Sequence, residues 1–235
     1  MLCKIAGLFT EVPATGGMSS RCREYVTDEN VGADIVICAD RYDLTKWSKL
    51  SYDDAVYMAS GLQFYHQILK FNGLMLHSSA VELDGKAYLF SGQSGMGKST
   101  HTKLWQQLFG ENAKVFNDDK PALRRVEDHW YAYGTPWCGK DGININTKVP
   151  VAGICFLQRG EENKIRRLSP KEATFFIISQ TMRWFKKEQN LDLMLNCVNR
   201  LAVEIPIYEL FNKPELSAAQ LSYETMRRGA EEANL

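Results

Sequence analysis

The sequence has no apolar stretch approaching the roughly 20 residues that a helix needs to span a bilayer. Its N-terminus also lacks the strongly basic start and long apolar segment of a signal peptide. We therefore expect no membrane-spanning segment and a cytoplasmic location. Net charge is absent too, because 28 Lys and Arg balance 28 Asp and Glu. Without net charge there is no general electrostatic attraction to nucleic acid or an anionic membrane, and we expect neither as a partner.

The cysteines lack the patterns of a disulfide framework or a zinc site. There is no C-x-x-C pair and no histidine at zinc-finger spacing, so we expect reduced thiols. Repeats, low-complexity tracts and a linker between independent domains are also missing. The 235 residues suffice for one sizeable domain with a small appendage. The six cysteines are Cys3, Cys22, Cys38, Cys138, Cys155 and Cys197.

The first part of the chain is typical of short strands and turns, followed by one long helix. The clearest strand is 33–39, and the Gly/Ser-rich stretch 14–20 predicts a loop. A helix is expected over about 52–71, with Ser51 as its N-cap and Gly73 as its stop.

The rest of the chain alternates between strand and helix patterns, which is typical of an α/β protein. Two β-rich runs around Asp84 and Gly85 predict a hairpin whose second strand leads into a glycine-rich loop. Another hairpin is expected around Glu127 and Asp128. The further predicted elements are a helix from 99 to Gly110, strands at 113–119, 149–160 and 206–211, and helices at 170–184, 188–203 and 215–231.

The glycine-rich stretch "FSGQSGMGKST" has the spacing G-x-x-x-x-G-K-S of a phosphate-binding loop. Glycines let the backbone turn its N–H groups toward phosphate oxygens, and the following helix N-terminus adds partial positive charge. Lys98 would reach the β- and γ-phosphates, and the Ser99 hydroxyl would bind Mg²⁺. A chance match in a Gly/Ser-rich turn is the alternative, but the predicted strand before and helix after favour nucleotide binding. The expected nucleotide-binding residues are Gly92, Gln93, Ser94, Gly95, Met96, Gly97, Lys98, Ser99 and Thr100.

Two acids, Asp118 and Asp119, close the next predicted strand. If this strand is parallel to the loop strand, both acids lie at the carboxyl edge of the sheet, where α/β proteins bind ligands. One carboxylate could hold Mg²⁺ and the other could accept a proton from an attacking hydroxyl. Adjacent residues on a strand face opposite ways, which favours two different roles. The alternative is a solvated acidic turn before Lys120 and Pro121.

Two further candidates have open alternatives. His77 precedes the loop strand, and a lone histidine there is more often structural than functional. The segment "YGTPWCGK" (133–140) is either a β-turn with a buried Trp137 or a functional loop. In the functional interpretation Lys140 would neutralise phosphate charge or fix a substrate.

The segment "NKPE" (212–215) is similar to the N-K-x-D element with which GTPases read guanine. Its last residue is Glu215 rather than Asp, and Pro214 and Glu215 also suit a plain helix start. No D-x-x-G element follows the loop at a suitable distance. The sequence thus argues against a GTPase switch.

The chain resembles the HPr kinase-like family in four segments, in chain order: "HSSAVELDGKAYLFSGQSGMGKST", "NDDKPALR", "YGTPWCGK" and "VPVAGICFLQRGEENKIRRLSPKEA". That family shares a fold with the catalytic domain of HPr kinase/phosphorylase and the nucleotide-binding half of phosphoenolpyruvate carboxykinase. The resemblance spans roughly residues 51 to 211. It implies an α/β fold in which a strongly curved mixed β-sheet, flanked by helices, carries the phosphate loop.

The resemblance also implies residue roles. His77 matches a histidine near the phosphates, and Asp118 matches the acid proposed as general base for the acceptor hydroxyl. Asp119 matches the acid associated with the metal. Lys98 and Ser99 match the residues that bind phosphate and Mg²⁺. ATP and Mg²⁺ are the implied cofactors.

The sequence departs from bifunctional HPr kinases in ways that argue against HPr as substrate and against phosphorylase activity. Thr100 stands where those enzymes carry Glu, and their HPr-docking segment is not found. Similar short relatives include kinases of free serine and of a serine in a ribosomally made peptide. By this resemblance 51–235 is the nucleotide-binding catalytic domain, and 1–50 a small β-rich subdomain packed on it.

We therefore predict an ATP- and Mg²⁺-dependent kinase that phosphorylates a hydroxyl, either a serine of a peptide or protein, free serine, or another small molecule. A non-catalytic nucleotide-binding regulator and a nucleotide hydrolase are the alternatives. The sequence does not determine the acceptor, the phosphoryl donor or the oligomeric state.

Overall fold

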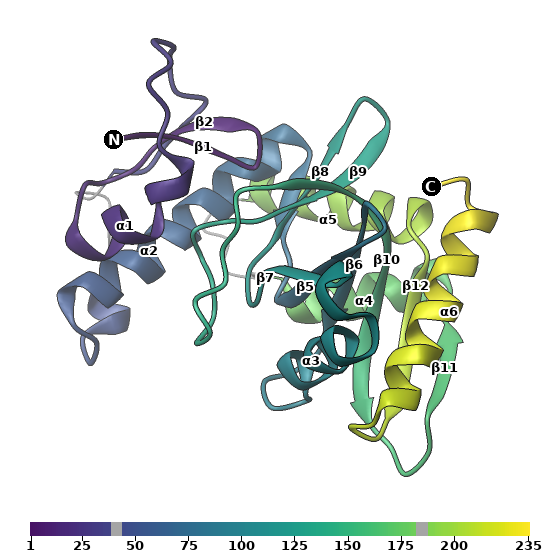
Figure 1. Cartoon of the computed structure of the whole chain (residues 1–235). Coiled ribbons are helices and arrows are strands. Elements are labelled where there is room, and N and C mark those ends of the chain that lie inside the picture. Colours follow the sequence, from purple (N-terminus) through teal and green to yellow (C-terminus); the bar gives the residue numbers. More distant parts are fainter. Residues whose placement is uncertain (39–43, 182–187) are drawn as a thin grey trace.

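The computed structural model describes residues 1–38, 44–181 and 188–235. It is a mixed α/β fold in which a strongly curved mixed sheet is flanked by helices, as Figure 1 shows. This confirms the expected α/β class and the expected curved mixed sheet with flanking helices.

A small three-stranded sheet forms the N-terminal part. Strands β1 (Leu2–Ile5) and β2 (Leu8–Glu11) are antiparallel, and β3 (Ile35–Val36) pairs parallel with β2. The strand predicted over 33–39 is thus only two residues long, and position 39 lies outside the described residues. The predicted loop over 14–20 was wrong, because α1 (Gly16–Arg21) occupies most of it. Met18 is fully buried, so tertiary burial overrides the Gly/Ser composition.

Nine strands of the described chain form the main sheet, in the order β4-β8-β9-β10-β6-β5-β7 with β12 and β11 branching from β10. The strands are β4 (Gly73–Met75), β5 (Ser78–Leu83), β6 (Lys86–Ser91), β7 (Lys114–Asn117), β8 (Ala122–Val126), β9 (His129–Tyr133), β10 (Lys148–Arg159), β11 (Lys164–Arg167) and β12 (Ile207–Asn212).

The long strand β10 joins the two halves of the sheet. Its first residues, 148–150, pair antiparallel with β9, whereas 151–156 pair parallel with β6. Its last residues, 154–159, pair parallel with β12. One strand with an antiparallel neighbour at its start and parallel neighbours further on makes the sheet mixed.

Both predicted hairpins are confirmed. Asp84 and Gly85, between β5 and β6, have φ of 54° and 71°, and Glu127 and Asp128, between β8 and β9, have φ of 49° and 69°. Positive φ at both central residues matches the right-handed twist of the strands they join.

The helices largely follow the sequence pattern. They are α2 (Tyr52–Ile68), α3 (Lys98–Phe109), α4 (Pro170–Gln180), α5 (Glu188–Glu204) and α6 (Leu216–Glu232), with short 3₁₀ turns at Arg23–Tyr25, Leu44–Trp47, Leu69–Phe71 and Gly110–Asn112. Ser51 caps α2 by accepting the N–H of Asp54 at 3.2 Å, as expected. The helical run ends at Asn72, with φ of 54°, rather than at Gly73.

Helix α4 ends earlier than predicted, because Thr181 leaves the helix and forms a β-bridge with Leu76. Residues 182–184 of the predicted helix lie outside the described residues.

Two apolar layers sandwich the sheet. On β6, Leu89 packs in one cluster with α2, α4 and α5, while Tyr88 and Phe90 pack in another with α3 and α6. Strand β10 alternates in the same way, with Phe156 in the first cluster and Leu157 in the second. The period of two along each strand produces the layered core.

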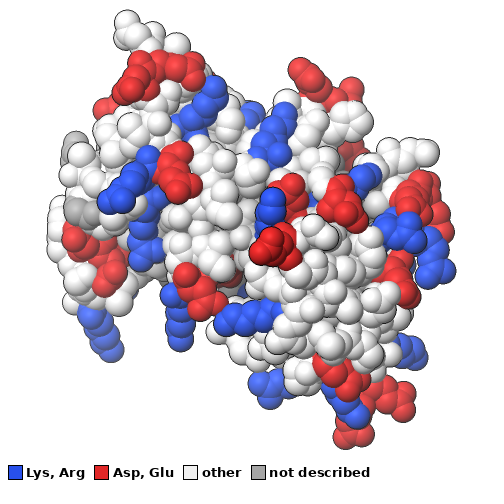
Figure 2. All heavy atoms as spheres, viewed as in Figure 1, with Lys and Arg blue, Asp and Glu red and all other residues white. Residues whose placement is uncertain are grey.

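The N-terminal sheet shares the first of these clusters with the main sheet. Over the described residues, no helix combines the length and apolar character needed to cross a bilayer. On the face shown in Figure 2, Lys and Arg side chains are interspersed with Asp and Glu, which agrees with the balanced composition.

Candidate functional site

The phosphate-loop motif, the two acids and His77 meet at one edge of the sheet. Strand β5 is antiparallel to both β6 and β7, so β6 and β7 run in the same direction. The carboxyl ends of β6 and β7 therefore lie beside the start of β5. Because the motif follows β6, the acids follow β7 and His77 precedes β5, this topology brings all three together.

The loop after β6 has the backbone that its glycines permit. Gly92, Gly95 and Gly97 have φ of 148°, 81° and 90°, which L side chains rarely adopt. A Cβ on Gly92 would also lie 3.1 Å from the carbonyl oxygen of Leu157. Helix α3 begins directly after this loop, at Lys98. The expected order of strand, loop and helix is confirmed, and binding of a nucleotide by it stays a prediction.

The ammonium group of Lys98 lies over the loop. Its Nζ donates to the carbonyl oxygens of Gly92 at 2.9 Å and Gln93 at 3.3 Å. Burial lowers the pKa of Lys98, and the negative charge of Asp119 partly opposes this effect. Two carbonyl oxygens of the loop thus hold this cation against the loop.

Asp119 forms a cluster with two basic side chains. The Nε2 of His77 lies 3.1 Å from its Oδ1, and Lys120 Nζ lies 3.1 and 3.0 Å from its two carboxylate oxygens. Burial would raise the pKa of Asp119, but the hydrogen bond from His77 and the charge of Lys120 outweigh it, and the pKa is lowered. Asp119 is therefore a stable carboxylate.

Asp118 is held by backbone amides instead of cations. Its Oδ1 accepts the N–H of Gly139 at 2.6 Å, and its Oδ2 accepts that of Asp141 at 3.1 Å. The residue is only 9% exposed. Burial raises the pKa of Asp118, although the two amide hydrogen bonds act in the opposite direction.

The two adjacent acids thus have pKa values pushed in opposite directions. Such a difference between neighbouring carboxylates is typical of sites in which one acid binds charge and the other moves a proton.

The segment "YGTPWCGK" contributes backbone groups more than side chains. Trp137 is buried, stacks on Phe64 with ring centroids 4.8 Å apart, and donates its Nε1–H to Ser60 at 3.1 Å. This supports the structural interpretation of Trp137. Lys140 is an exposed residue of the turn whose amides hold Asp118, and its predicted role stays untested.

This same segment connects the site to the N-terminal part of the chain. Arg21 Nη1 donates to the Sγ of Cys138 at 3.4 Å, and its guanidinium lies 4.0 Å from the ring centroid of Tyr57. Asn144 donates its side-chain N–H to the carbonyl oxygen of Arg21 at 3.1 Å. The turn that holds Asp118 is thus in contact with α1.

Sequence reasoning missed Lys120 and Gly139. Lys120 follows the acid pair directly, and that adjacency was the available signal for an ion pair. Nothing in the sequence around Gly139 indicates that it contacts Asp118, because the two residues lie far apart in the chain. A Cβ there would lie 2.9 Å from Asp118 Oδ2, so only a glycine allows the turn to approach this closely.

The two expected Mg²⁺ ligands, Ser99 and Asp119, carry oxygen donors of the type that Mg²⁺ binds. No group of three or more His, Cys, Asp or Glu side chains that could hold a metal occurs in the described part of the chain. Mg²⁺ commonly takes only one or two protein oxygens and completes its shell with water and substrate phosphate. The exposed hydroxyl of Ser99 and the ionised Asp119 suit that kind of site.

The comparisons with known proteins place the chain in a family. The model of the SynChlorMet cassette protein ScmC family matches residues 49–213, which is most of the chain. The chain belongs to the ScmC family. The matched region of this ScmC-family chain contains the loop, the acid pair and the turn at 139–141. A search of the curated proteins finds no match.

Among solved structures, the chain is similar to the Hpr(Ser) kinase/phosphatase from Coxiella burnetii. The sequence identity is 14%, the match covers 55% of this chain and 98% of that chain, and the TM-score is 0.30. A TM-score of 0.30 is too low to transfer residue roles from that protein to this one.

Proposed function

We propose that this ScmC-family chain is an ATP- and Mg²⁺-dependent kinase that transfers a phosphoryl group to a hydroxyl. The observation that carries the proposal is the acid pair with opposed pKa values at the sheet edge where the loop begins. Phosphoryl transfer depends mainly on positioning and charge stabilisation, so a loop, cations and two carboxylates in separate roles suffice for it.

The loop and its lysine have the role of holding the nucleotide phosphates. The N–H groups of the loop and the start of α3 would face the phosphate oxygens, and Lys98 would exchange its bonds to Gly92 and Gln93 for bonds to phosphate. Ser99 and Asp119 would hold Mg²⁺, which supplies positive charge at the phosphates. His77 and Lys120 keep Asp119 ionised and oriented for this purpose.

Asp118 is the proposed general base. Each of its carboxylate oxygens accepts one backbone N–H and keeps a second lone-pair position for the hydroxyl proton of an acceptor. Its raised pKa makes it a better proton acceptor than Asp119, whose carboxylate is already paired with Lys120 and hydrogen-bonded by His77.

The acceptor is proposed to be a serine hydroxyl of a peptide or protein, free serine, or another small alcohol. We assign the acceptor side to the turn at 137–141, because this turn holds Asp118 and contacts α1. Residues 1–50 would then be a small subdomain on the substrate side of a 51–235 catalytic domain.

Incubation with γ-labelled ATP, Mg²⁺ and fractionated cell extract tests the proposal, with the labelled product identified by mass spectrometry. We expect a phosphorylated alcohol with the wild-type chain and none with Lys98→Ala. Release of labelled phosphate without a labelled acceptor in any fraction would instead indicate a nucleotide hydrolase. Nucleotide binding with neither product would indicate a non-catalytic regulator.

A further inference from the structure

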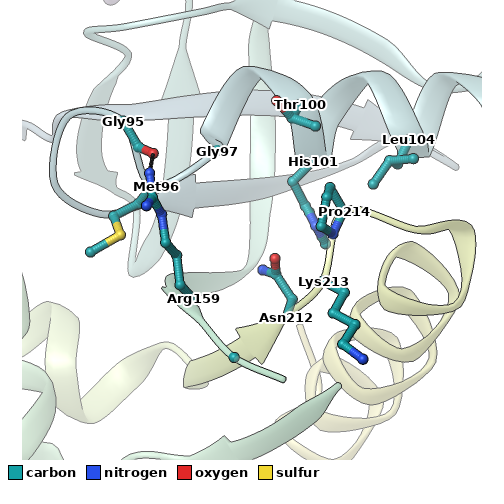
Figure 3. Close-up of a pocket in the computed structure, with 11 residues that line it drawn as sticks. Gly95, Met96, Gly97, Thr100, His101, Leu104, Arg159, Asn212, Lys213 and Pro214 are labelled. Atoms are coloured by element: carbon teal, nitrogen blue, oxygen red, sulfur yellow. Dashed lines mark hydrogen bonds between the residues drawn. The ribbon is translucent and has the colours of Figure 1, made fainter. Parts of the chain in front are cut away.

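A pocket of about 360 Å³ adjoins the phosphate loop. The loop and the start of α3 form one wall, and the ends of β10 and β12 form another (Figure 3). Both strands run parallel to β6, so their carboxyl ends open at the same sheet edge as the loop. A molecule with its phosphates in the loop therefore has this pocket directly beside it.

One polar group in the pocket has no partner. Asn212, the last residue of β12, projects between Arg159 and His101 (Figure 3). Its Nδ2 is buried and makes no hydrogen bond within the described part of the chain. A buried amide N–H without an acceptor is costly, so this group is one that a ligand would satisfy.

The walls around Asn212 suit a flat, uncharged ring. Met96, Leu104 and Pro214 provide apolar surface. Arg159 donates its Nη2–H to the carbonyl oxygen of Gly95 at 3.2 Å, which places a planar guanidinium beside the loop. Such a plane can stack on an aromatic ring.

His101 lines the pocket from α3, and its side chain is already engaged there. Its Nε2 lies 3.0 Å from the Oγ of Ser222. The unpartnered amide of Asn212 is therefore the group in this pocket that is left for a ligand.

The carboxylate that a guanine-reading element would use is already engaged. Glu215 Oε1 accepts from Asn163 Nδ2 at 2.7 Å and from Ser217 Oγ at 2.8 Å. In the N-K-x-D element that the segment 212–215 resembles, the last residue supplies an acid for the base. Here these two bonds hold the acid against a neighbouring loop and the start of α6.

We infer that this pocket binds the base of an adenine nucleotide and that the Asn212 carboxamide recognises its edge. The inference rests on the proposed function, because it takes the phosphates to lie in the loop. Adenine presents a ring-nitrogen acceptor beside its amino donor, and a carboxamide pairs with that combination through Nδ2 and Oδ1. Guanine carries two adjacent N–H donors on its pairing edge, and the Glu215 carboxylate that would meet them is not among the residues that line the pocket.

Calorimetric titration with ATP, GTP and tripolyphosphate, each with Mg²⁺, tests the inference in the full chain. The variant is Asn212→Leu, which keeps the size of the side chain and removes both polar atoms. The matched control is Asn199→Leu, an exposed asparagine of α5 outside the pocket. Thermal melting checks that both variants fold. Asn212→Leu should fold well, since Nδ2 has no bond to lose.

We expect wild-type and Asn199→Leu chains to bind ATP more tightly than GTP or tripolyphosphate. Asn212→Leu should bind ATP at least about tenfold more weakly, the loss expected for one base-recognition pair, and tripolyphosphate unchanged. Unchanged ATP affinity in Asn212→Leu, or equal wild-type affinity for ATP and tripolyphosphate, would overturn the base pocket while leaving the phosphate site intact. A wild-type chain that binds none of the three ligands would overturn the proposed function itself.

Discussion

The imidazole Nε2 of His77, which precedes β5, lies 3.1 Å from the carboxylate Oδ1 of Asp119, which follows β7. The antiparallel pairing of β5 with β7 creates this contact, since it places the residue before one strand beside the residues after the other. A histidine that sequence reasoning left open between a structural and a functional role is therefore part of the candidate site.

His77→Ala should weaken the proposed metal site by removing a partner that orients Asp119. Loss of such a partner costs roughly 10–100-fold in metal affinity or activity. The Mg²⁺ concentration at half-maximal transfer should rise, and His77→Gln, which can still donate a hydrogen bond, should recover part of the loss. An unchanged Mg²⁺ dependence in His77→Ala would contradict this role.

Lys98→Ala should abolish transfer without unfolding the protein. Among the described residues, the lysine is bonded only to two loop carbonyl oxygens, so its removal leaves the core intact, whereas the phosphoryl group loses its main cation. We expect kcat to fall by about 10²–10³ or more, as for loss of one charge-stabilising donor. Lys114→Ala, at the exposed start of β7, is the control and should retain activity. Comparable activity in the two variants would exclude the assigned role of Lys98.

Asp118→Asn should abolish transfer while leaving nucleotide affinity nearly unchanged. The amide cannot accept the proton of the attacking hydroxyl, but the loop and Lys98 are unaffected. The substitution also replaces one oxygen that accepts a backbone N–H, so we expect a loss of stability of about 1–3 kcal/mol. Single-turnover kinetics below the melting temperature separate the two effects, and normal turnover would rule out Asp118 as the base.

Gly139→Ala tests the position of Asp118 without changing its chemistry. The new Cβ would lie 2.9 Å from Asp118 Oδ2, so either the turn or the carboxylate must move. We expect a lower kcat at unchanged nucleotide affinity. Gly32→Ala is the matched control, because a Cβ there meets no atom within 4 Å. Equal kcat values for both variants would show that the position of Asp118 is not critical.

His101 should make the protein less stable in acid. Burial lowers its pKa from 6.5 to about 4 in the folded state, so the unfolded chain binds the proton more readily between these values. Stability therefore falls as the pH drops from about 6.5 to about 4, by about 3 kcal/mol in full. Urea denaturation at several pH values should show a smaller acid loss for His101→Gln, which can keep the bond to Ser222. Identical pH dependence in both proteins would contradict this expectation.

Features that depend on neighbouring residues could be predicted from the sequence. The two hairpin turns, the Ser51 cap and the strand-loop-helix order around Lys98 all follow from backbone preferences over a few residues. Helix α1 shows the limit of this reasoning. Its Gly/Ser-rich composition favours a loop, but burial of Met18 against the rest of the molecule stabilises a helix.

The sequence by itself determined the α/β class, the phosphate-loop motif and the presence of two adjacent acids. Only the tertiary structure decided what each acid contacts, because those partners lie far away in the chain. Asp118 accepts hydrogen bonds from the backbone N–H groups of Gly139 and Asp141, whereas the carboxylate of Asp119 contacts the imidazole of His77. These different surroundings push the pKa values of the two acids apart. Long-range pairing of strands, which no local pattern encodes, thus turns two identical side chains into two chemically different groups.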